Sequence, residues 1–312
     1  MVFGCVFLLP ELNEKLQSRA GIAAFSLWEI ARKPLHMAHA TKNPKTKGAR
    51  QVSTQLLIYE RVVPISRQRH QDWSVKVGKN YAFTRHVNSV PLVAAEFQAA
   101  AAEYAIVFAG TEKAVMPSVI LGIRERENLY VSKTGEWDTK YLPAFIRRYP
   151  FVFSSDDEGK TFTVCVDEEY MGCNQQGLGE RLFDAEGERT QYLGSVLEFL
   201  KAYQAQFQRT QIFCNKLKEL ELLEPMQAQF EPKTGEKVSL SGFMAVNRDR
   251  IKKLSGDKLA ELAKSDELEL VYLHLQSMRN ISLLAERMAS QIPEKDKTVL
   301  KNMGNDPDMV TH

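Results

Sequence analysis

The middle of the chain reads NYAFTRHVNSVPLVAAEF (residues 80–97), VILGIRERENLYV (119–131) and GEWDTKYLPAFIRRYPF (135–151). Amide, aromatic, proline and arginine side chains recur in these three segments more often than the packing of a core requires. Short runs of β-branched residues lie among them, and such runs favour strands. We therefore expect this region to contribute both strands and the most specific polar groups of the fold.

Prolines and alanines predict the secondary structure of this region. An alanine-rich segment at 91–104 begins with Pro91, and proline is favourable in the first turn of a helix. Residues 105–109, 119–123 and 129–131 are predicted strands, and 144–148 is a short helix that must end before Pro150. On the N-terminal side, residues 55–63 are a predicted strand that ends at Pro64.

The rest of the chain alternates between hairpins and blocks of helix. Residues 151–153 and 161–166 are a predicted hairpin, followed by a polar loop at 167–189 and a helix capped by Thr190. A second hairpin, at 226–230 and 238–246, precedes one helix at 257–264 and another that carries Val271 to Ala285. Strands in adjacent runs and helices in blocks predict an α+β fold: a largely antiparallel sheet with flanking helices and a helical C-terminal part.

The net charge of +2 conceals an asymmetry along the chain. Residues 1–52 hold eight Lys or Arg against three acidic residues, so the remainder is mildly acidic. We expect residues 1–53 to be a basic extension and linker, or sequence upstream of a later start at Met37. Residues 54–290 are the predicted body, and 291–312 a disordered tail. Because the body lacks a basic face, no nucleic-acid partner is expected.

Composition excludes several other classes of protein. No apolar run approaches the roughly 20 residues that span a bilayer, so the chain is not expected to span a membrane. The cysteines, Cys5, Cys165, Cys173 and Cys214, form no CxxC pair and no disulfide framework. The apolar N-terminus lacks a preceding basic residue, which makes it a poor export signal. We expect a soluble protein in the cytoplasm.

The sequence contains few groups arranged for a reaction. It has no HExxH, GxSxG or Walker-type motif, and no catalytic residue can be assigned. His86 with Glu96 is the only pairing that suggests a metal, but ten residues and Pro91 separate them. His274 lies on an amphipathic helix, where a hydrogen-bonded core histidine is expected. No metal and no cofactor are predicted.

The central segments supply the candidates for ligand binding. Arginine can clamp a carboxylate or phosphate with two donors, and aromatic rings offer flat apolar surfaces. Asparagines can fix turns or donate to a ligand. Taken singly, each side chain is better explained by structure, but together they predict a pocket for a small molecule. The candidates are Asn80, Asn88, Glu96, Asn128, Trp137, Tyr141, Arg147 and Arg148.

Much of the chain resembles the SapC family of bacterial proteins. The resemblance rests on LLIYERVVPISRQRH (56–70), NSVPLVAAEF (88–97), LGIRERENLYV (121–131), YLPAFIRRYPF (141–151), LSGFMAVNRDRIKKL (240–254) and ELELVYLHLQSM (267–278). It implies an association with a bacterial surface layer, and it supplies no catalytic residues. The family shares its label with a permease of antimicrobial-peptide uptake, a function that a chain without membrane spans cannot perform.

Three functions remain open on this basis. The first is a non-catalytic protein that binds an unknown small molecule or protein in support of cell-surface or nutrient-uptake systems. The second is an enzyme, or an accessory subunit of one, acting on an anionic or aromatic substrate held by Arg147, Arg148 and Trp137. The third is a structural interaction module. A shared pocket would favour the first two, and internal hydrogen bonds on the same residues would favour the third.

Overall fold

The computed structural model describes residues 6–8, 57–110, 114–156, 161–230 and 238–290. The fold is α+β, and every pair of named strands in these ranges is antiparallel. The largest sheet has six strands in the order β1-β11-β12-β5-β6-β4. These are β1 (Val6–Leu8), β11 (Leu223–Phe230), β12 (Val238–Val246), β5 (Ile106–Gly110), β6 (Val115–Ile120) and β4 (Ser89–Pro91).

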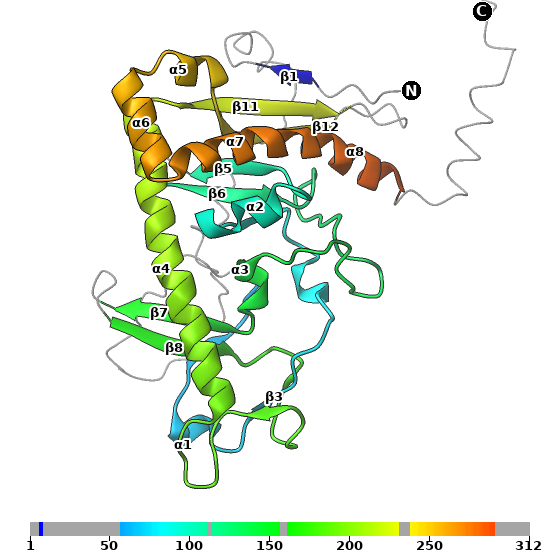
Figure 1. Cartoon of the computed structure of the whole chain (residues 1–312). Helices are drawn as coiled ribbons and strands as arrows, with labels where there is room; N and C mark the ends of the chain where they lie inside the picture. The colour runs from blue at the N-terminus through cyan, green and yellow to red at the C-terminus, as the bar shows by residue number, and fades with distance from the viewer. Residues whose placement is uncertain (1–5, 9–56, 111–113, 157–160, 231–237, 291–312) are drawn as a thin grey trace, which may run out of the picture.

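Two three-stranded sheets complete the strand content of the described ranges. One has the order β2-β8-β7, with β2 (Val62–Pro64), β8 (Thr161–Asp167) and β7 (Phe151–Asp156). The other has the order β10-β3-β9, with β10 (Glu180–Arg181), β3 (Ser74–Val75) and β9 (Cys173–Asn174). Figure 1 places both below the six-stranded sheet, with β3 beside the first short helix at the lower end of the molecule.

Helices cover these sheets and continue into the C-terminal part (Figure 1). Three of them have one turn: α1 (Arg67–His70), α2 (Phe97–Ala100) and α3 (Ala144–Arg147). The longer ones are α4 (Gln191–Glu219), α6 (Gly256–Lys264), α7 (Glu267–Ser277) and α8 (Ile281–Ser290), with the short α5 (Arg248–Lys252) before α6. Single 3-10 turns occur at Ala82–Thr84, Ala94–Glu96 and Met278–Asn280.

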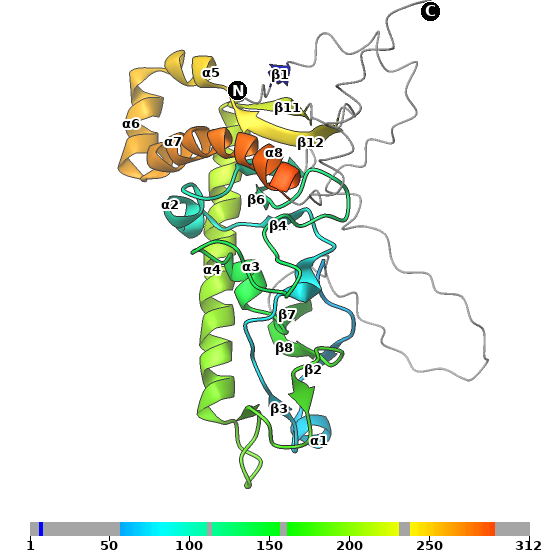
Figure 2. The same ribbon diagram turned by 90° about the vertical axis from the view of Figure 1, so that its right-hand side faces the viewer.

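The 29-residue helix α4 connects the two ends of the molecule. As predicted, Thr190 caps it, its side-chain oxygen accepting from the backbone N of Leu193 at 3.3 Å. Its inward face carries Leu193 and Leu200 against the core of the small sheets, and Phe213 and Leu217 against the core of the large sheet. Figures 1 and 2 show it running from α1 and β3 up to α6, so one helix spans both cores.

The core of the large sheet joins strands to helices that are distant in sequence. Phe108 of β5 contacts Phe213 of α4, with ring centroids 6.3 Å apart, and His274 of α7, with centroids 5.0 Å apart. All three side chains are buried. Burial of such aromatic groups stabilises the fold.

The predicted elements are largely confirmed, with several differences. The strand expected at 119–123 lies earlier, as β6, and the polar loop expected at 167–189 contains β9 and β10. A 3-10 turn at Met278–Asn280 divides the helix expected to carry Val271 to Ala285. The helix expected at 91–104 is confined to 94–100, because Pro91 belongs to β4 and pairs with Ser118. The strand expected at 55–63 begins only at Val62, and residues 57–58 form a turn. The strand expected at 129–131 is reduced to a single bridge between Val131 and Trp137, since the chain reverses at once through Gly135.

Some predictions fall outside the described residues. These are the basic extension and linker at 1–53, of which only residues 6–8 are described, and the disordered tail at 291–312, so the domain boundaries stay predictions. Within the described ranges, no helix combines the length and apolar character needed to cross a bilayer.

Candidate functional site

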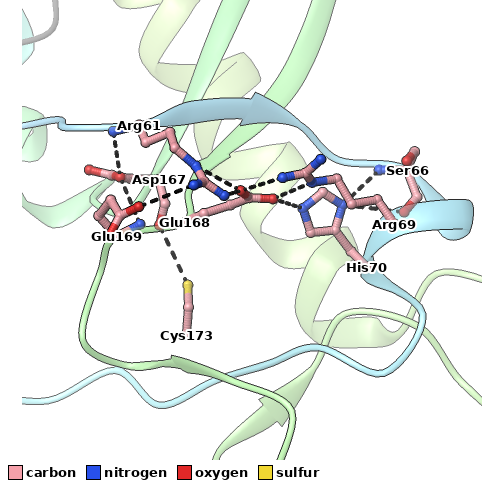
Figure 3. A network of polar contacts seen from close by, with 8 residues as sticks. All are labelled: Arg61, Ser66, Arg69, His70, Asp167, Glu168, Glu169 and Cys173. Atoms are coloured by element: carbon pink, nitrogen blue, oxygen red, sulfur yellow. Dashed lines mark hydrogen bonds and ion pairs between the residues drawn. The ribbon is translucent and has the colours of Figure 1, made fainter.

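A buried carboxylate, Glu168, lies at the centre of a network of polar contacts (Figure 3). It follows β8 directly, and its side chain is 1% exposed. Arg61 donates to it from Nε at 3.0 Å and also from Nη2. Arg69 donates from Nε at 2.5 Å and from Nη2 at 2.7 Å. Two arginines before and after β2 are thus joined to a residue about a hundred positions downstream.

His70 completes this arrangement from inside the fold. Its Nε2 lies 3.1 Å from Oε1 of Glu168, and its Nδ1 lies 3.2 Å from the backbone N of Ser66. The side chain is fully buried, and this desolvation lowers its pKa, although the hydrogen bond to Glu168 acts in the opposite direction. A neutral imidazole that donates to Glu168 and accepts from Ser66 satisfies both contacts.

Asp167, the last residue of β8, uses its carboxylate to hold the adjoining backbone. It accepts from the backbone N of Glu60 at 2.8 Å, of Arg61 at 2.9 Å and of Glu169 at 3.2 Å. The hydroxyl of Tyr149 also donates to it at 3.2 Å. We refer to Arg61, Arg69, His70, Asp167 and Glu168 as the Glu168 cluster.

The electrostatics of the Glu168 cluster favour fixed charges over proton transfer. Hydrogen bonds from Arg69 and Arg61 lower the pKa of Glu168 to about 2, so it stays ionised at neutral pH. Nearby, the thiol of Cys173 lies 3.5 Å from the backbone oxygen of Asp167, and burial raises its pKa to about 12. A protonated thiol is a poor nucleophile, and a carboxylate with this many donors is a poor base. The cluster acts as a brace between β2, α1 and β8.

Sequence reasoning missed the Glu168 cluster. Residues 167–169 (DEE) belong to the predicted polar loop, and the sequence assigns no role to His70. The available signal was three basic residues at 61–70 and three acidic ones immediately after a predicted strand. Only the register of β2 with β8, in which Val62 pairs with Asp167, brings the two sets together.

Four of the eight predicted site residues lie together in the middle of the molecule. Tyr141 donates from its hydroxyl to Oε1 of Glu96 at 2.7 Å, and Arg147 lies over the ring of Tyr141 at 6.0 Å. Trp137 donates from Nε1 to the hydroxyl of Tyr104 at 2.8 Å and to the backbone oxygen of Tyr141 at 3.3 Å. The side chains of Glu96, Trp137 and Tyr141 are therefore engaged in internal hydrogen bonds, which favours a structural role for these three and leaves Arg147 as the group that can meet a ligand.

Arg147 is the exposed member of this group. Its Nε donates to the backbone oxygen of Leu142 at 3.0 Å, and its guanidinium lies 5.5 Å from the ring centroid of Phe199 on α4. Cation–π contacts with two rings hold the positive charge in a fixed position at the surface. We refer to Tyr141, Arg147 and Phe199 as the aromatic shelf.

Arg148 points into the core instead. It is 5% exposed, and its guanidinium lies 4.3 Å from the ring centroid of Phe145 and 5.0 Å from that of Tyr203. It also hydrogen-bonds Tyr59, whose pKa burial nevertheless raises to about 12. The adjacent arginines therefore differ in environment, and Arg148 contributes to packing.

The three asparagines hold backbone turns. The side chain of Asn80 accepts from the backbone N of Ala82 at 2.9 Å. Asn128 is buried, donates to the backbone oxygen of Thr84 at 3.1 Å and accepts from the backbone N of Tyr130 at 2.9 Å. At Asn88 the backbone oxygen accepts from the amides of residues 121 and 122. The structure does not bring these asparagines together with Arg147 in one cavity among the described residues.

The remaining histidine of interest, His274, is a core residue as predicted. It is fully buried, its Nδ1 lies 2.9 Å from the backbone oxygen of Ile106, and its Nε2 accepts from the backbone N of Val246 at 3.0 Å. Burial lowers its pKa to about 4, so it is neutral at physiological pH. Within the described ranges, no three His, Cys, Asp or Glu side chains are grouped so as to hold a metal ion.

The comparison with protein families agrees with the resemblance noted above. The SapC family model matches residues 65–284, more than two-thirds of the chain. The chain belongs to the SapC family. The matched range includes both the aromatic shelf and, apart from Arg61, the Glu168 cluster. Neither a curated protein nor a solved structure matches the chain.

Proposed function

We propose that this SapC-family chain is a non-catalytic binding protein that takes an anionic ligand on the aromatic shelf. The observation that supports the proposal is the geometry of Arg147, an exposed arginine held against two rings. A guanidinium positioned in this way presents a planar set of donors that matches a carboxylate or a phosphate.

The residues behind the shelf keep it in place. Glu96 is buried, and its carboxylate accepts from the hydroxyl of Tyr141 and, at 2.7 Å, from the backbone N of Ala144. Burial, and after it the negative charge of Glu96, raises the pKa of Tyr141. Its hydroxyl therefore stays protonated and donates. The rings that position Arg147 are therefore fixed before any ligand arrives, which lowers the entropic cost of binding.

The state of the buried reactive groups supports a binding role over catalysis. Burial raises the pKa of both Cys173 and Cys214 to about 12, which keeps these thiols protonated. His70 and His274 are buried, have lowered pKa values and use both ring nitrogens in internal contacts. These two thiols and two imidazoles, which could otherwise attack a substrate or transfer a proton, are thus occupied by the fold.

The wider role follows from the family resemblance alone. We propose that ligand or partner binding supports cell-surface or nutrient-uptake systems, and that the protein acts in the cytoplasm. The competing proposal of an enzyme for an anionic or aromatic substrate would use the same arginine. Turnover of a bound compound would distinguish it from simple binding.

A thermal-shift screen of the full-length protein tests the binding proposal. We expect at least one compound in a library of carboxylates, phosphates and aromatic acids to raise the melting temperature by mass action. Arg147→Ala should abolish this rise, because the charge that recognises the ligand is lost. Its own melting temperature should change little, since Arg147 is exposed.

Arg209→Ala is the matched control, because it removes an exposed arginine from a different helix, α4. This variant should keep the ligand-induced rise in melting temperature. The proposal is wrong if no anionic compound stabilises the wild type, or if Arg147→Ala responds as the wild type does.

A further inference from the structure

Three exposed apolar side chains lie at the end of the small sheet β10-β3-β9. Val77 is 60% exposed, Met171 84% and Leu178 51%. They are half of the six large hydrophobic residues that are exposed in the described part of the chain. We refer to these three residues as the apolar tip.

The pairing of the strands places the apolar tip in one row. Val75 of β3 pairs with Cys173 of β9, and the backbone N of Lys76 then donates to the oxygen of Gly172 at 2.9 Å. On the other side, Gly179 lies so close that a Cβ on it would be 2.6 Å from Cα of Lys76. Next to Lys76, Gly172 and Gly179 in the three segments are Val77, Met171 and Leu178, the residues of the apolar tip.

The apolar tip continues a face of the β10-β3-β9 sheet that is buried closer to the core. Val75 is fully buried, and Cys173 packs against the same core cluster. Alternate residues of a strand share a face, so residues 77 and 171 lie on this face two positions further on. There the core has ended, and the same apolar face meets solvent.

Hydrogen bonds hold the longer loop of the apolar tip in its shape. The side chain of Asn174 donates to the backbone oxygens of Gly172 at 3.0 Å and Leu178 at 2.8 Å. Its oxygen accepts from the backbone N of Gln176 at 3.1 Å and of Leu178 at 3.0 Å. The fold therefore fixes Leu178 in an exposed position, at a free-energy cost that a bound surface would offset.

The charges around the apolar tip are positive. Segments 76–79 and 170–179 contain two exposed lysines, Lys76 and Lys79, and no acidic residue. Of the acidic residues that flank them, Glu169 pairs with Arg61 at 3.3 Å. Glu180, which pairs with Val75, is exposed two positions from Leu178, so the two lysines leave a small net positive charge. The rim thus favours a partner with negative charge next to apolar groups.

The size of the apolar tip distinguishes between partners of that kind. A stable protein interface buries about 800 Å² on each partner, which three side chains cannot supply. Binding to a bilayer has no such threshold of buried area. Each inserted apolar side chain adds its own transfer free energy, and each lysine adds its own attraction to lipid phosphates. Apolar loop ends flanked by lysines are therefore better suited to a lipid surface than to a second copy of the chain.

We propose that the apolar tip docks the protein onto the surface of an anionic phospholipid bilayer. Val77, Met171 and Leu178 enter the boundary between headgroups and acyl chains, and Lys76 and Lys79 contact the phosphates. The contact is peripheral and reversible, and it is independent of the aromatic shelf.

Co-sedimentation of the full-length protein with vesicles tests the proposal. The wild type should bind vesicles of phosphatidylcholine and phosphatidylglycerol mixed 3:1 (about a quarter anionic lipid), and it should bind pure phosphatidylcholine more weakly. The double variant Met171→Gln with Leu178→Gln should bind at least about tenfold more weakly. In the double variant Lys76→Gln with Lys79→Gln, the affinity for anionic vesicles should fall about fivefold per lysine, and raised salt should weaken binding of the wild type by a similar factor.

Matched variants show whether the apolar tip is specific. Ile212→Gln removes an equally exposed hydrophobic residue from α4 (63% exposed), and Lys253→Gln with Lys264→Gln removes two exposed lysines elsewhere. These variants should bind as the wild type does, and all variants should keep its melting temperature. The proposal is overturned if wild-type protein stays in the supernatant with anionic vesicles, if the controls lose binding equally, or if the tip variants instead convert a dimer to a monomer in size-exclusion chromatography.

Discussion

His274→Ala is expected to lower the free energy of unfolding by about 3–5 kcal/mol. The substitution leaves a cavity beside Phe108 and removes the partners of two buried backbone groups, the N–H of Val246 and the oxygen of Ile106. Urea denaturation followed by circular dichroism measures the loss. His86→Ala, which removes an exposed histidine, should change stability by less than about 0.5 kcal/mol.

The pH dependence of stability identifies His274 as the cause. Its pKa is about 4 in the fold, against 6.5 for an ordinary histidine, so the unfolded chain binds the extra proton first. Stability from the neutral imidazole is complete above about pH 6.5 and is lost as the pH falls towards 4. His70, with its lowered pKa, acts in the same direction. His274→Ala should therefore reduce the slope without abolishing it, and an unchanged slope would contradict the assignment.

Glu168→Gln is expected to cost about 2–4 kcal/mol of unfolding free energy. The amide keeps the size of the side chain but removes the charge that both Arg61 and Arg69 approach, and it replaces an acceptor oxygen with a donor nitrogen. Because both guanidinium groups are about half exposed, water offsets part of the loss. Chemical denaturation at pH 7 measures it.

The neighbouring Glu169 is the matched control. It is about half exposed and contacts Arg61 at 3.3 Å, so Glu169→Gln should cost less than about 1 kcal/mol. Equal losses at the two positions would mean that the Glu168 cluster is a surface charge network, not a buried brace.

The parts of the fold that the sequence predicts best depend on neighbours in the chain. The hairpin of β11 and β12, the cap at Thr190 and the single turn of α3 all follow from local turn, capping and proline signals. The helix at 91–104 was predicted too long because Pro91 pairs with Ser118 of β6, a tertiary contact that overrides local helix propensity.

The candidate site depends on contacts that no local pattern contains. Glu168 and Arg69 are 99 residues apart, and only the register of β2 with β8 brings them together. Arg147 and Arg148 are adjacent in sequence, but the direction of each side chain depends on α4, which supplies Phe199 to one and Tyr203 to the other. The sequence therefore named Tyr141 and Arg147 as candidates, but it could not predict Phe199 as their neighbour or separate the exposed arginine from the buried one.

Arg147 is held at the surface and Arg148 packs in the core, and urea unfolding of Arg147→Ala and Arg148→Ala side by side shows whether the two arginines differ in this way. Arg148→Ala should lose about 2–3 kcal/mol, because its side chain packs among Phe145, Tyr203 and Tyr59. Arg147→Ala should lose less than about 0.5 kcal/mol, which leaves its charge available to a ligand. Equal losses, or a greater loss at Arg147, would mean that Arg147 braces the fold and is not free to meet a ligand.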